Sequence, residues 1–244
     1  MNPVNKISML VEDKWQGDFD RLSSSWKDLE HRLNEEPQTE YRRVWRENVL
    51  ANIADSQEID IELAQVCVPF RLDQLPSLQA PYPEAIPVLL RHLKRKHRRD
   101  IEAAIISALA IPYAGEEAVQ ILTELLQSRR ETMPPTTLYA LGNALAEIAG
   151  KGGAILLRQI ASDPQNGDAR LEPMLKLGQI KDPGVESIAL SWLHANELPW
   201  YAIRALRKAK VWTAIETVKD FLDAEDSEIR AEARKFCKVA ADKT

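Results

Sequence analysis

Apolar residues recur at helical spacing in a unit that repeats about five times after residue 83. In all but the first unit, the last helix carries a large apolar residue followed three positions later by another apolar residue. The large residues of successive units are Leu109, Leu145, Leu177, Leu206 and Phe236, at intervals of 36, 32, 29 and 30 residues. Such intervals accommodate two short helices. One helical hairpin cannot bury its own apolar face, so the pattern predicts stacked hairpins that share a continuous core.

Helix-ending and helix-starting residues (Gly, Asp, Ser and Pro) between the apolar stretches divide each unit into two helices. Gly115, Gly150, Asp163-Pro164, Asp182-Pro183-Gly184 and Asp226-Ser227 fall where one helix should end and the next begin. The predicted helix pairs are 84–95 with 99–111, 116–128 with 135–149, 153–162 with 168–180, 184–195 with 198–209, and 213–223 with 227–241.

Residues 1–80 do not follow the repeat. Two apolar stretches at helical spacing, 19–33 and 41–53, flank a Glu-Glu-Pro break and predict two helices, whereas no regular element is predicted for 66–82. We therefore predict an all-α protein: a right-handed α-α solenoid of about five helix pairs over 81–244, with a divergent helical N-terminal cap over 1–80.

Charge is distributed unevenly along the chain. The net charge of −5 arises from the predicted cap, since residues 1–80 have a net charge of −6 and residues 81–244 a net charge of +1. This balance argues against general nucleic-acid binding, which depends on many Lys and Arg side chains that neutralise phosphates, but it leaves room for a local basic groove.

Composition and cysteine usage indicate a cytoplasmic protein. The longest apolar runs are far shorter than the roughly 20 residues of a membrane-spanning helix, and charges throughout the first 30 residues exclude a signal-peptide core. Cys67 and Cys237 lie 170 residues apart among apolar neighbours, which favours two buried thiols over a disulfide. No membrane partner is expected.

Three segments resemble HEAT repeats, particularly the short bacterial type that is also found in phycobilin lyases. They are Ala140-Leu141-Gly142-Asn143-Ala144-Leu145, Leu177-Gly178-Gln179-Ile180-Lys181-Asp182 and Ile229-Arg230-Ala231-Glu232-Ala233-Arg234. The resemblance covers residues 83–241. It implies an interaction scaffold, an adaptor or a toxin-neutralising (immunity) or regulatory protein. The iron-dependent hydroxylases of this family resemble one another in paired His-Glu steps, and this chain contains no His-Glu dipeptide.

In such arrays the second helix of each pair lines the concave face, so equivalent positions on successive second helices form stripes across a groove. The C-terminal part of this groove is predicted to be basic and aromatic, because Arg230, Arg234 and Lys238 lie four residues apart on one helix face and Arg204 and Lys208 repeat the arrangement. The candidate partner-binding residues are Tyr139, Asn143, Trp200, Arg204, Lys208, Arg230, Arg234 and Lys238.

This basic stripe has two interpretations. Glu228, Glu232 and their neighbours could neutralise it on an ordinary solvated face. Alternatively, it binds an acidic segment of a partner protein, since Arg and Trp are enriched where binding energy concentrates.

The densest basic cluster is the run 91–99, with six Lys or Arg in nine residues at a predicted inter-helix turn. The candidate anion-binding residues in it are Arg95, Lys96, Arg98 and Arg99. Exposed charge runs are more often solvating than functional, and positive charge at a helix C-terminus also complements the helix dipole.

No catalytic or cofactor-binding motif is evident. His31, His92, His97 and His194 are scattered, and none pairs with another ligand at metal-binding spacing, so the sequence predicts no metal site and no cofactor. The first functional hypothesis is therefore a non-enzymatic adaptor or inhibitor that binds a protein partner with an acidic segment. The alternative is a nucleic-acid-binding or DNA-base-modifying solenoid, in which Trp200 supports a displaced base. An enzyme with a buried acidic site ranks third.

Overall fold

The computed structural model describes residues 56–66, 68, 71–78, 81–150 and 152–241. Every regular element among them is an α-helix or a 3-10 helix, which confirms the prediction of an all-α protein. Both helices predicted in 1–55 lie outside the described residues. No helix in the described ranges is long and apolar enough to cross a membrane.

The chain forms two compact units, Met1–Leu109 and Ala110–Thr244. Their boundary lies one helix pair later than the predicted division between residues 80 and 81.

The first unit contains a helix over residues 56–65, the 3-10 helix η1 (Leu72–Ser77), α3 (Ala85–Leu93) and α4 (Arg99–Ala108). Helix α4 packs against η1 and α3, and the hydroxyl of Tyr82 donates a hydrogen bond to the carbonyl oxygen of Ala108 at 2.9 Å. η1 thus lies in the stretch for which the sequence predicted no regular element.

The second unit contains eight α-helices and three 3-10 helices among its described residues. The α-helices are α5 (Glu116–Arg129), α6 (Pro135–Ala149), α7 (Ala154–Ser162), α8 (Leu171–Ile180), α9 (Val185–His194), α10 (Pro199–Ala209), α11 (Ile215–Lys219) and α12 (Ser227–Ala241). The 3-10 helices are η2 (Arg130–Thr132), η3 (Pro164–Arg170) and η4 (Trp212–Ala214).

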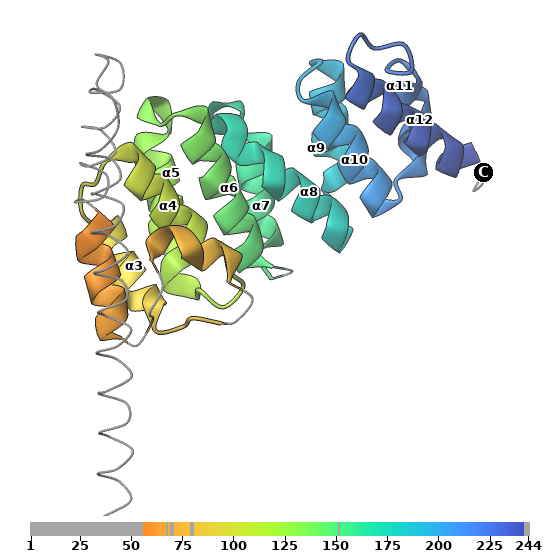
Figure 1. Ribbon diagram of the computed structural model, residues 1–244. Helices are drawn as coiled ribbons and strands as arrows, with labels where there is room; N and C mark the ends of the chain where they lie inside the picture. Colours follow the sequence, from red (N-terminus) through yellow and green to blue (C-terminus); the bar gives the residue numbers. More distant parts are fainter. Residues whose placement is uncertain (1–55, 67, 69–70, 79–80, 151, 242–244) are drawn as a thin grey trace, which may run out of the picture. The chain divides into compact units, whose positions relative to one another are not determined.

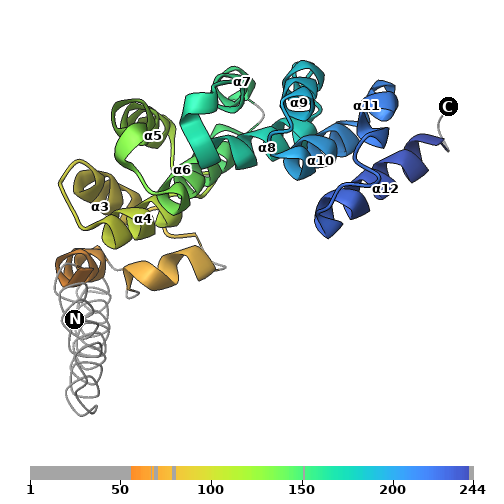
Figure 2. The ribbon, with the colours of Figure 1, turned by 90° about the horizontal axis from the view of Figure 1, so that it is seen from above.

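These helices form two layers within the second unit. Helices α6, α8, α10 and α12 contact one another in succession, and α5, α7, α9 and α11 each pack on the even-numbered helix that follows (Figure 2). The apolar repeat residues Leu145, Leu177, Leu206 and Phe236 are all fully buried in the even-numbered layer. The large residues of the repeat signature therefore mark the core, as the sequence predicted, whereas the apolar residues three positions later are half-buried or, at Val239, exposed.

The predicted helices agree with the observed ones to within a few residues, except at two places (Figure 1). The predicted helix 168–180 is divided into η3 and α8, and within η3 Gly167 has non-helical angles (φ 51°, ψ −131°). The predicted helix 213–223 is shorter because Phe221 and Leu222 donate to carbonyls three residues back, a 3-10 pattern, after α11 has ended.

Aspartates start several helices, as the sequence predicted. The carboxylate of Asp163 accepts a hydrogen bond from the amide of Gln165, and that of Asp182 accepts one from the amide of Gly184. Oδ1 of Asp226 accepts bonds from the first-turn amides of α12, at 2.7 and 3.2 Å. The bonds of Asp163 and Asp226 satisfy first-turn donors that the helix leaves unpaired, whereas the bond of Asp182 closes the turn just before α9.

Glycine allows close contact in the even-numbered layer at two helix junctions. A Cβ on Gly178 of α8 would lie 2.6 Å from the carbonyl oxygen of Ala205 on α10. A Cβ on Gly142 of α6 would collide with the backbone of Ala169 in η3, where its nearest carbon would be 2.7 Å away. Both glycines lie within helices, so the close approach of the neighbouring backbone explains them.

Candidate functional site

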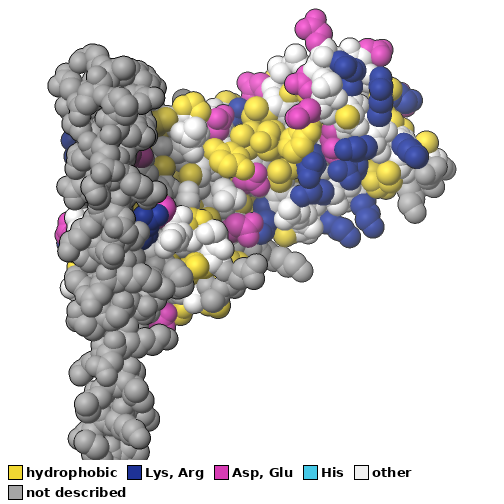
Figure 3. Space-filling model, in the orientation of Figure 1, with side chains coloured by type: hydrophobic (Ala, Val, Ile, Leu, Met, Phe, Trp, Pro, Cys, Tyr) yellow, Lys and Arg dark blue, Asp and Glu magenta, His cyan; other side chains and the backbone are white. Residues whose placement is uncertain are grey.

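Six of the predicted partner-binding residues lie on α10 and α12, which pack against each other. Spacing by four residues places each helix's three side chains on one side of that helix. We call this set the α10–α12 face, and Figure 3 shows Lys and Arg side chains gathered over these helices. Its members are Trp200, Arg204 and Lys208 of α10 and Arg230, Arg234 and Lys238 of α12.

Arg204 is held over the ring of Trp200. The guanidinium carbon lies 4.7 Å from the ring centroid, and the edge of Trp200 contacts the ring of Tyr201 at a centroid distance of 4.8 Å. The Nε atom of Arg204 is buried and has no hydrogen-bond partner among the described residues. The cation–π contact therefore holds this side chain, with a contribution of about 0.5–2 kcal/mol.

Positive charge accumulates around Arg204. Burial lowers the pKa of the half-buried Lys208, and the neighbouring Arg204 guanidinium lowers it further. Arg234 and Lys238 are exposed, and neither forms an ion pair with a described residue. The Glu172 carboxylate offsets part of the effect of Arg204 on Lys208, and a bound anion would relieve the repulsion between these two cations further.

Arg230 differs from its neighbours. Its Nη1 donates hydrogen bonds to the carbonyl oxygens of Ala224 and Glu225, at 2.5 and 2.6 Å. These bonds attach α12 to the loop that precedes it. Arg230, which the sequence predicted as a partner contact, is thus largely engaged within the protein.

The solvated-face interpretation of the basic stripe fails for Glu232. The side chain of Glu232 is only 2% exposed, and its Oε1 accepts a hydrogen bond from Nε of Arg207 on α10 at 2.6 Å. Lys235, on the same helix, lies 3.9 Å from the other carboxylate oxygen. Glu232 therefore bridges the two helices from the inside and, apart from Lys235, forms no ion pair with the exposed cations of α12, Arg234 and Lys238.

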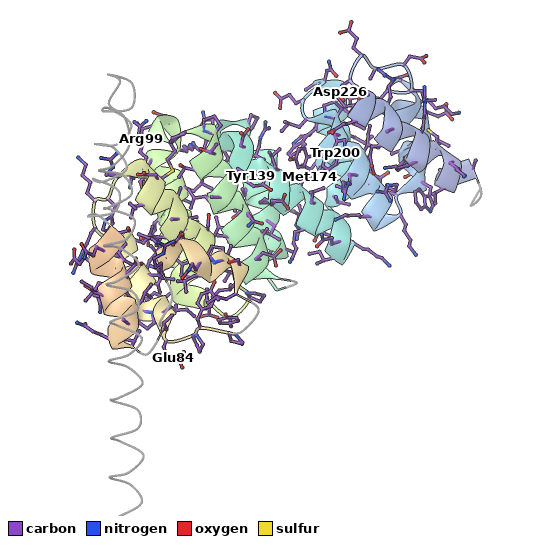
Figure 4. All side chains as sticks on the ribbon, in the orientation of Figure 1. Glu84, Arg99, Tyr139, Met174, Trp200 and Asp226 are labelled. Atoms are coloured by element: carbon purple, nitrogen blue, oxygen red, sulfur yellow. The ribbon has the colours of Figure 1, made fainter. Side chains whose placement is uncertain are left out.

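Tyr139 and Asn143 lie on α6, and Tyr139 contacts a carboxylate rather than a cation. Tyr139 is 40% exposed and donates a hydrogen bond from its hydroxyl to Oε1 of Glu172 on α8 at 2.9 Å. Burial and this bond raise the pKa of Tyr139 to about 12. Asn143 is half-buried. Figure 4 shows Tyr139 on α6 and Trp200 on α10, with Met174 of α8 between them.

Sequence reasoning missed Glu172 as a member of this surface. Leu171 and Leu175 lie six and two residues before Leu177, as Trp200 and Arg204 do before Leu206, but both are only 7% exposed. The half-buried Glu172 lies next to Leu171 in α8, and burial together with the negative charge of Glu172 raises the pKa of Tyr201 on α10. Glu172 thus adds one carboxylate of α8 next to the basic side chains of α10.

The basic run 91–99 lies at the turn between α3 and α4, as predicted, but part of it is neutralised. Nη1 of Arg95 is 2.9 Å from a carboxylate oxygen of Glu58, and Nε of Arg98 is 3.7 Å from Asp100. Lys96 and Arg99 are exposed. Within the described residues this run offers less free positive charge than the α10–α12 face.

The histidines are not all isolated, which contradicts the prediction that they are scattered. Nδ1 of the fully buried His92 lies 3.3 Å from Nε2 of His97, and Nε2 of His92 lies 3.2 Å from Oε2 of Glu62. Burial lowers the pKa of His92, although the Glu62 carboxylate opposes this effect. Cys237 has a free thiol, as expected, but it is half-buried rather than buried, and Cys67 lies outside the described residues.

No family model, no curated protein and no solved structure matches this chain. Its chemistry must therefore be argued from its own side chains. The α10–α12 face offers an aromatic ring, a guanidinium stacked on it and several ammonium or guanidinium groups without an ion-pair partner among the described residues. Such a surface can bind an anionic ligand that also presents apolar atoms.

Proposed function

We propose that this chain is a HEAT-like α-solenoid that binds an acidic segment of a partner protein on the α10–α12 face. It acts as an adaptor or inhibitor in the bacterial cytoplasm, without catalysing a reaction and without a catalytic cofactor. Immunity against a toxin is one role of this kind. The successive packing of α6, α8, α10 and α12, with their partners in a second layer, supports the solenoid part of the proposal.

One observation carries the binding proposal: Arg204 is stacked on Trp200 beside Lys208, and no described residue forms an ion pair with Arg204. The stack places the Arg204 side chain before a ligand arrives, so less side-chain entropy is lost on binding. Tryptophan and arginine are also the residues that most often dominate binding energy at protein interfaces.

The charge distribution favours a protein segment over a nucleic-acid strand. A phosphate backbone repeats its charge at short regular intervals and needs a long basic track. Here the carboxylate of Glu172 on α8 lies close enough to Lys208 of α10 to oppose the lowering of its pKa, so it interrupts the positive charge. In the 91–99 run, Arg95 is paired with Glu58. An acidic peptide of a few residues fits the short basic region on α10 and α12.

The proposal is tested by fluorescence anisotropy with two labelled probes of equal charge. One is a glutamate-rich peptide that contains leucine and tyrosine, and the other is a single-stranded oligonucleotide. The test variant replaces Arg204, Arg234 and Lys238 by glutamine. The control variant replaces Lys96, Arg99 and Lys219 by glutamine, which removes the same charge at positions outside α10 and α12.

We expect the wild type and the control to bind the peptide, and the test variant to bind it at least about 10-fold more weakly. Trp200→Ala alone should weaken binding by a factor of about 30, which corresponds to about 2 kcal/mol. Oligonucleotide binding with a steep salt dependence and no peptide binding would instead support the nucleic-acid alternative. Equal losses in the test and control variants would contradict the assignment to this face.

A further inference from the structure

A second cluster of polar side chains lies in the first unit, between the helix at 56–65 and α3. These two helices lie side by side (Figure 1), and ion pairs connect them. Glu58 and Glu62 are four residues apart and so occupy one side of their helix, opposite His92 of α3. One ligand atom from each of the three residues lies within 4.8 Å of the other two.

His92 has an unusual hydrogen-bonding position for a fully buried side chain. Its Nδ1 lies 3.3 Å from Nε2 of His97. Its Nε2 lies 3.2 Å from Oε2 of Glu62, but the geometry is not that of a hydrogen bond, and Nε2 is buried without a hydrogen-bond partner among the described residues. One nitrogen of a buried imidazole thus faces a carboxylate without a hydrogen bond to it.

The tautomer of His92 determines what could bind between its Nε2 atom and the Glu62 carboxylate. If Nδ1 carries the proton, it donates to Nε2 of His97, and the lone pair of Nε2 then faces the lone pairs of the Glu62 carboxylate. Two such acceptors repel each other unless a cation lies between them. Histidine ligands of metal ions commonly donate their other ring N–H to a neighbouring acceptor in this way.

The distance between the two acceptors fits a shared ion. Zinc binds histidine nitrogen at about 2.0–2.1 Å and carboxylate oxygen at about 2.0–2.2 Å, so two of its ligands in a tetrahedral arrangement are about 3.3 Å apart. The observed separation between Nε2 of His92 and Oε2 of Glu62 is 3.2 Å.

We propose that Glu58, Glu62 and His92 bind one divalent transition-metal ion such as Zn²⁺, and that His97 fixes the His92 tautomer that ligates it. One nitrogen and two carboxylate ligands suit such an ion, and three protein ligands leave a position for water. The site lies outside the α10–α12 face and is independent of the proposed function.

Two arginines modulate this site. Nη2 of Arg91 lies 2.5 Å from Oε2 of Glu62, and Nη1 of Arg95 lies 2.9 Å from Oε1 of Glu58. About half of each arginine side chain is exposed, so both can move toward solvent. Their positive charges compete with a metal ion for the carboxylates. Removing one arginine should therefore strengthen metal binding, whereas a purely structural ion-pair network predicts no such gain.

The test is isothermal titration of the full chain with ZnCl₂ in a buffer that does not bind metal, together with visible spectroscopy of the Co²⁺ form. Helical content by circular dichroism confirms that each variant is folded. The variants are Glu62→Gln, His97→Ala and Arg91→Gln. His194→Gln is the control, because His194 is exposed on α9 in the other unit.

We expect the wild type to bind one equivalent. Glu62→Gln should weaken binding at least about 10-fold and His97→Ala by about 10-fold. Arg91→Gln should strengthen binding several-fold, and His194→Gln should have no effect. Absence of a binding heat in both the wild type and Arg91→Gln would overturn the proposal, as would unchanged affinity in Glu62→Gln. A thiolate-to-cobalt charge-transfer band would show that cysteine binds the ion instead, and this result would also overturn it.

Discussion

The two helix glycines of the even-numbered layer allow a quantitative test of how α6, α8 and α10 pack. In Gly178→Ala the new Cβ would lie 2.6 Å from the carbonyl oxygen and 2.8 Å from the Cα of Ala205. Ordinary contact begins at 3.4 Å, so α8 and α10 must separate by about 0.8 Å. In Gly142→Ala the clash with the backbone of Ala169 is more severe.

Two opposing effects determine the stability of these variants. Alanine is favoured over glycine inside a helix by about 1 kcal/mol. Overpacking in a close-packed interior typically costs about 1–3 kcal/mol, because a backbone cannot move aside as a side chain can. We therefore expect net destabilisation by about 1 kcal/mol for Gly178→Ala and about 2 kcal/mol for Gly142→Ala.

Gly152→Ala is the matched control, since nothing lies within 4 Å of a Cβ at that exposed position. It should change the free energy of unfolding by no more than about 0.5 kcal/mol. The assay is urea unfolding followed by circular dichroism, with the midpoint and the slope compared between variants. An increase in stability in Gly142→Ala or Gly178→Ala would refute the close approach, because only the helix preference of alanine would then remain.

Three further predictions concern single side chains. Asp226→Ala should destabilise the protein by about 1 kcal/mol in urea unfolding because the first-turn amides of α12 lose their acceptor, whereas Asp226→Asn should be nearly neutral. Arg207→Gln should lower the free energy of unfolding by about 3 kcal/mol and Glu232→Gln by about 1 kcal/mol, because only Arg207→Gln leaves the buried carboxylate without its arginine. The reverse order would contradict this assignment. The folded-state pKa of Tyr139, about 12, exceeds its unfolded value, so its contribution to stability is present below pH 10 and is lost between pH 10 and 12. Tyr139→Phe removes the phenol, so its stability should not fall between pH 10 and 12. An NMR titration of the tyrosine ring carbons should then lack the Tyr139 transition that the wild type shows.

Local signals in the sequence were sufficient to locate the helices. The anchor residues Leu145, Leu177 and Leu206 are buried, and the aspartates before the helices accept backbone hydrogen bonds as predicted. Both features depend on residues within one or two turns of each other. The length of α11 was overestimated because turns continue the helical apolar spacing after the helix itself has ended.

The register between repeats was harder to predict because it depends on contacts between helices. The apolar anchors place Leu145 and Leu177 at equivalent positions, 32 residues apart. The close approaches make Gly142 and Gly178 equivalent instead, 36 residues apart, which is a shift of about one helical turn. Such a shift preserves the apolar face of a helix, so periodicity alone cannot detect it. The short stretch Leu-Gly at 141–142 and at 177–178 was the available signal.

Pairings between distant segments were not predictable from spacing. Glu62 and His92 are separated by 30 residues and meet only because the helix at 56–65 packs beside α3. The spacing of Glu58 and Glu62 by one helical turn was visible in the sequence, but nothing in it indicated which histidine would face them.

The burial of Glu232 connects the packing of the second unit to its surface charge. Glycine allows α6 to approach η3 and α8 to approach α10, whereas α10 and α12 are connected, beside their shared apolar core, by the ion pair of Arg207 with Glu232. This pair places one carboxylate of α12 inside the protein, where it neutralises an arginine of the neighbouring helix. The exposed Arg234 and Lys238 of α12 therefore lose the acidic neighbour that their sequence suggests. The positive charge of the α10–α12 face is thus a consequence of how the two helices are held together, and it persists as long as Glu232 remains buried.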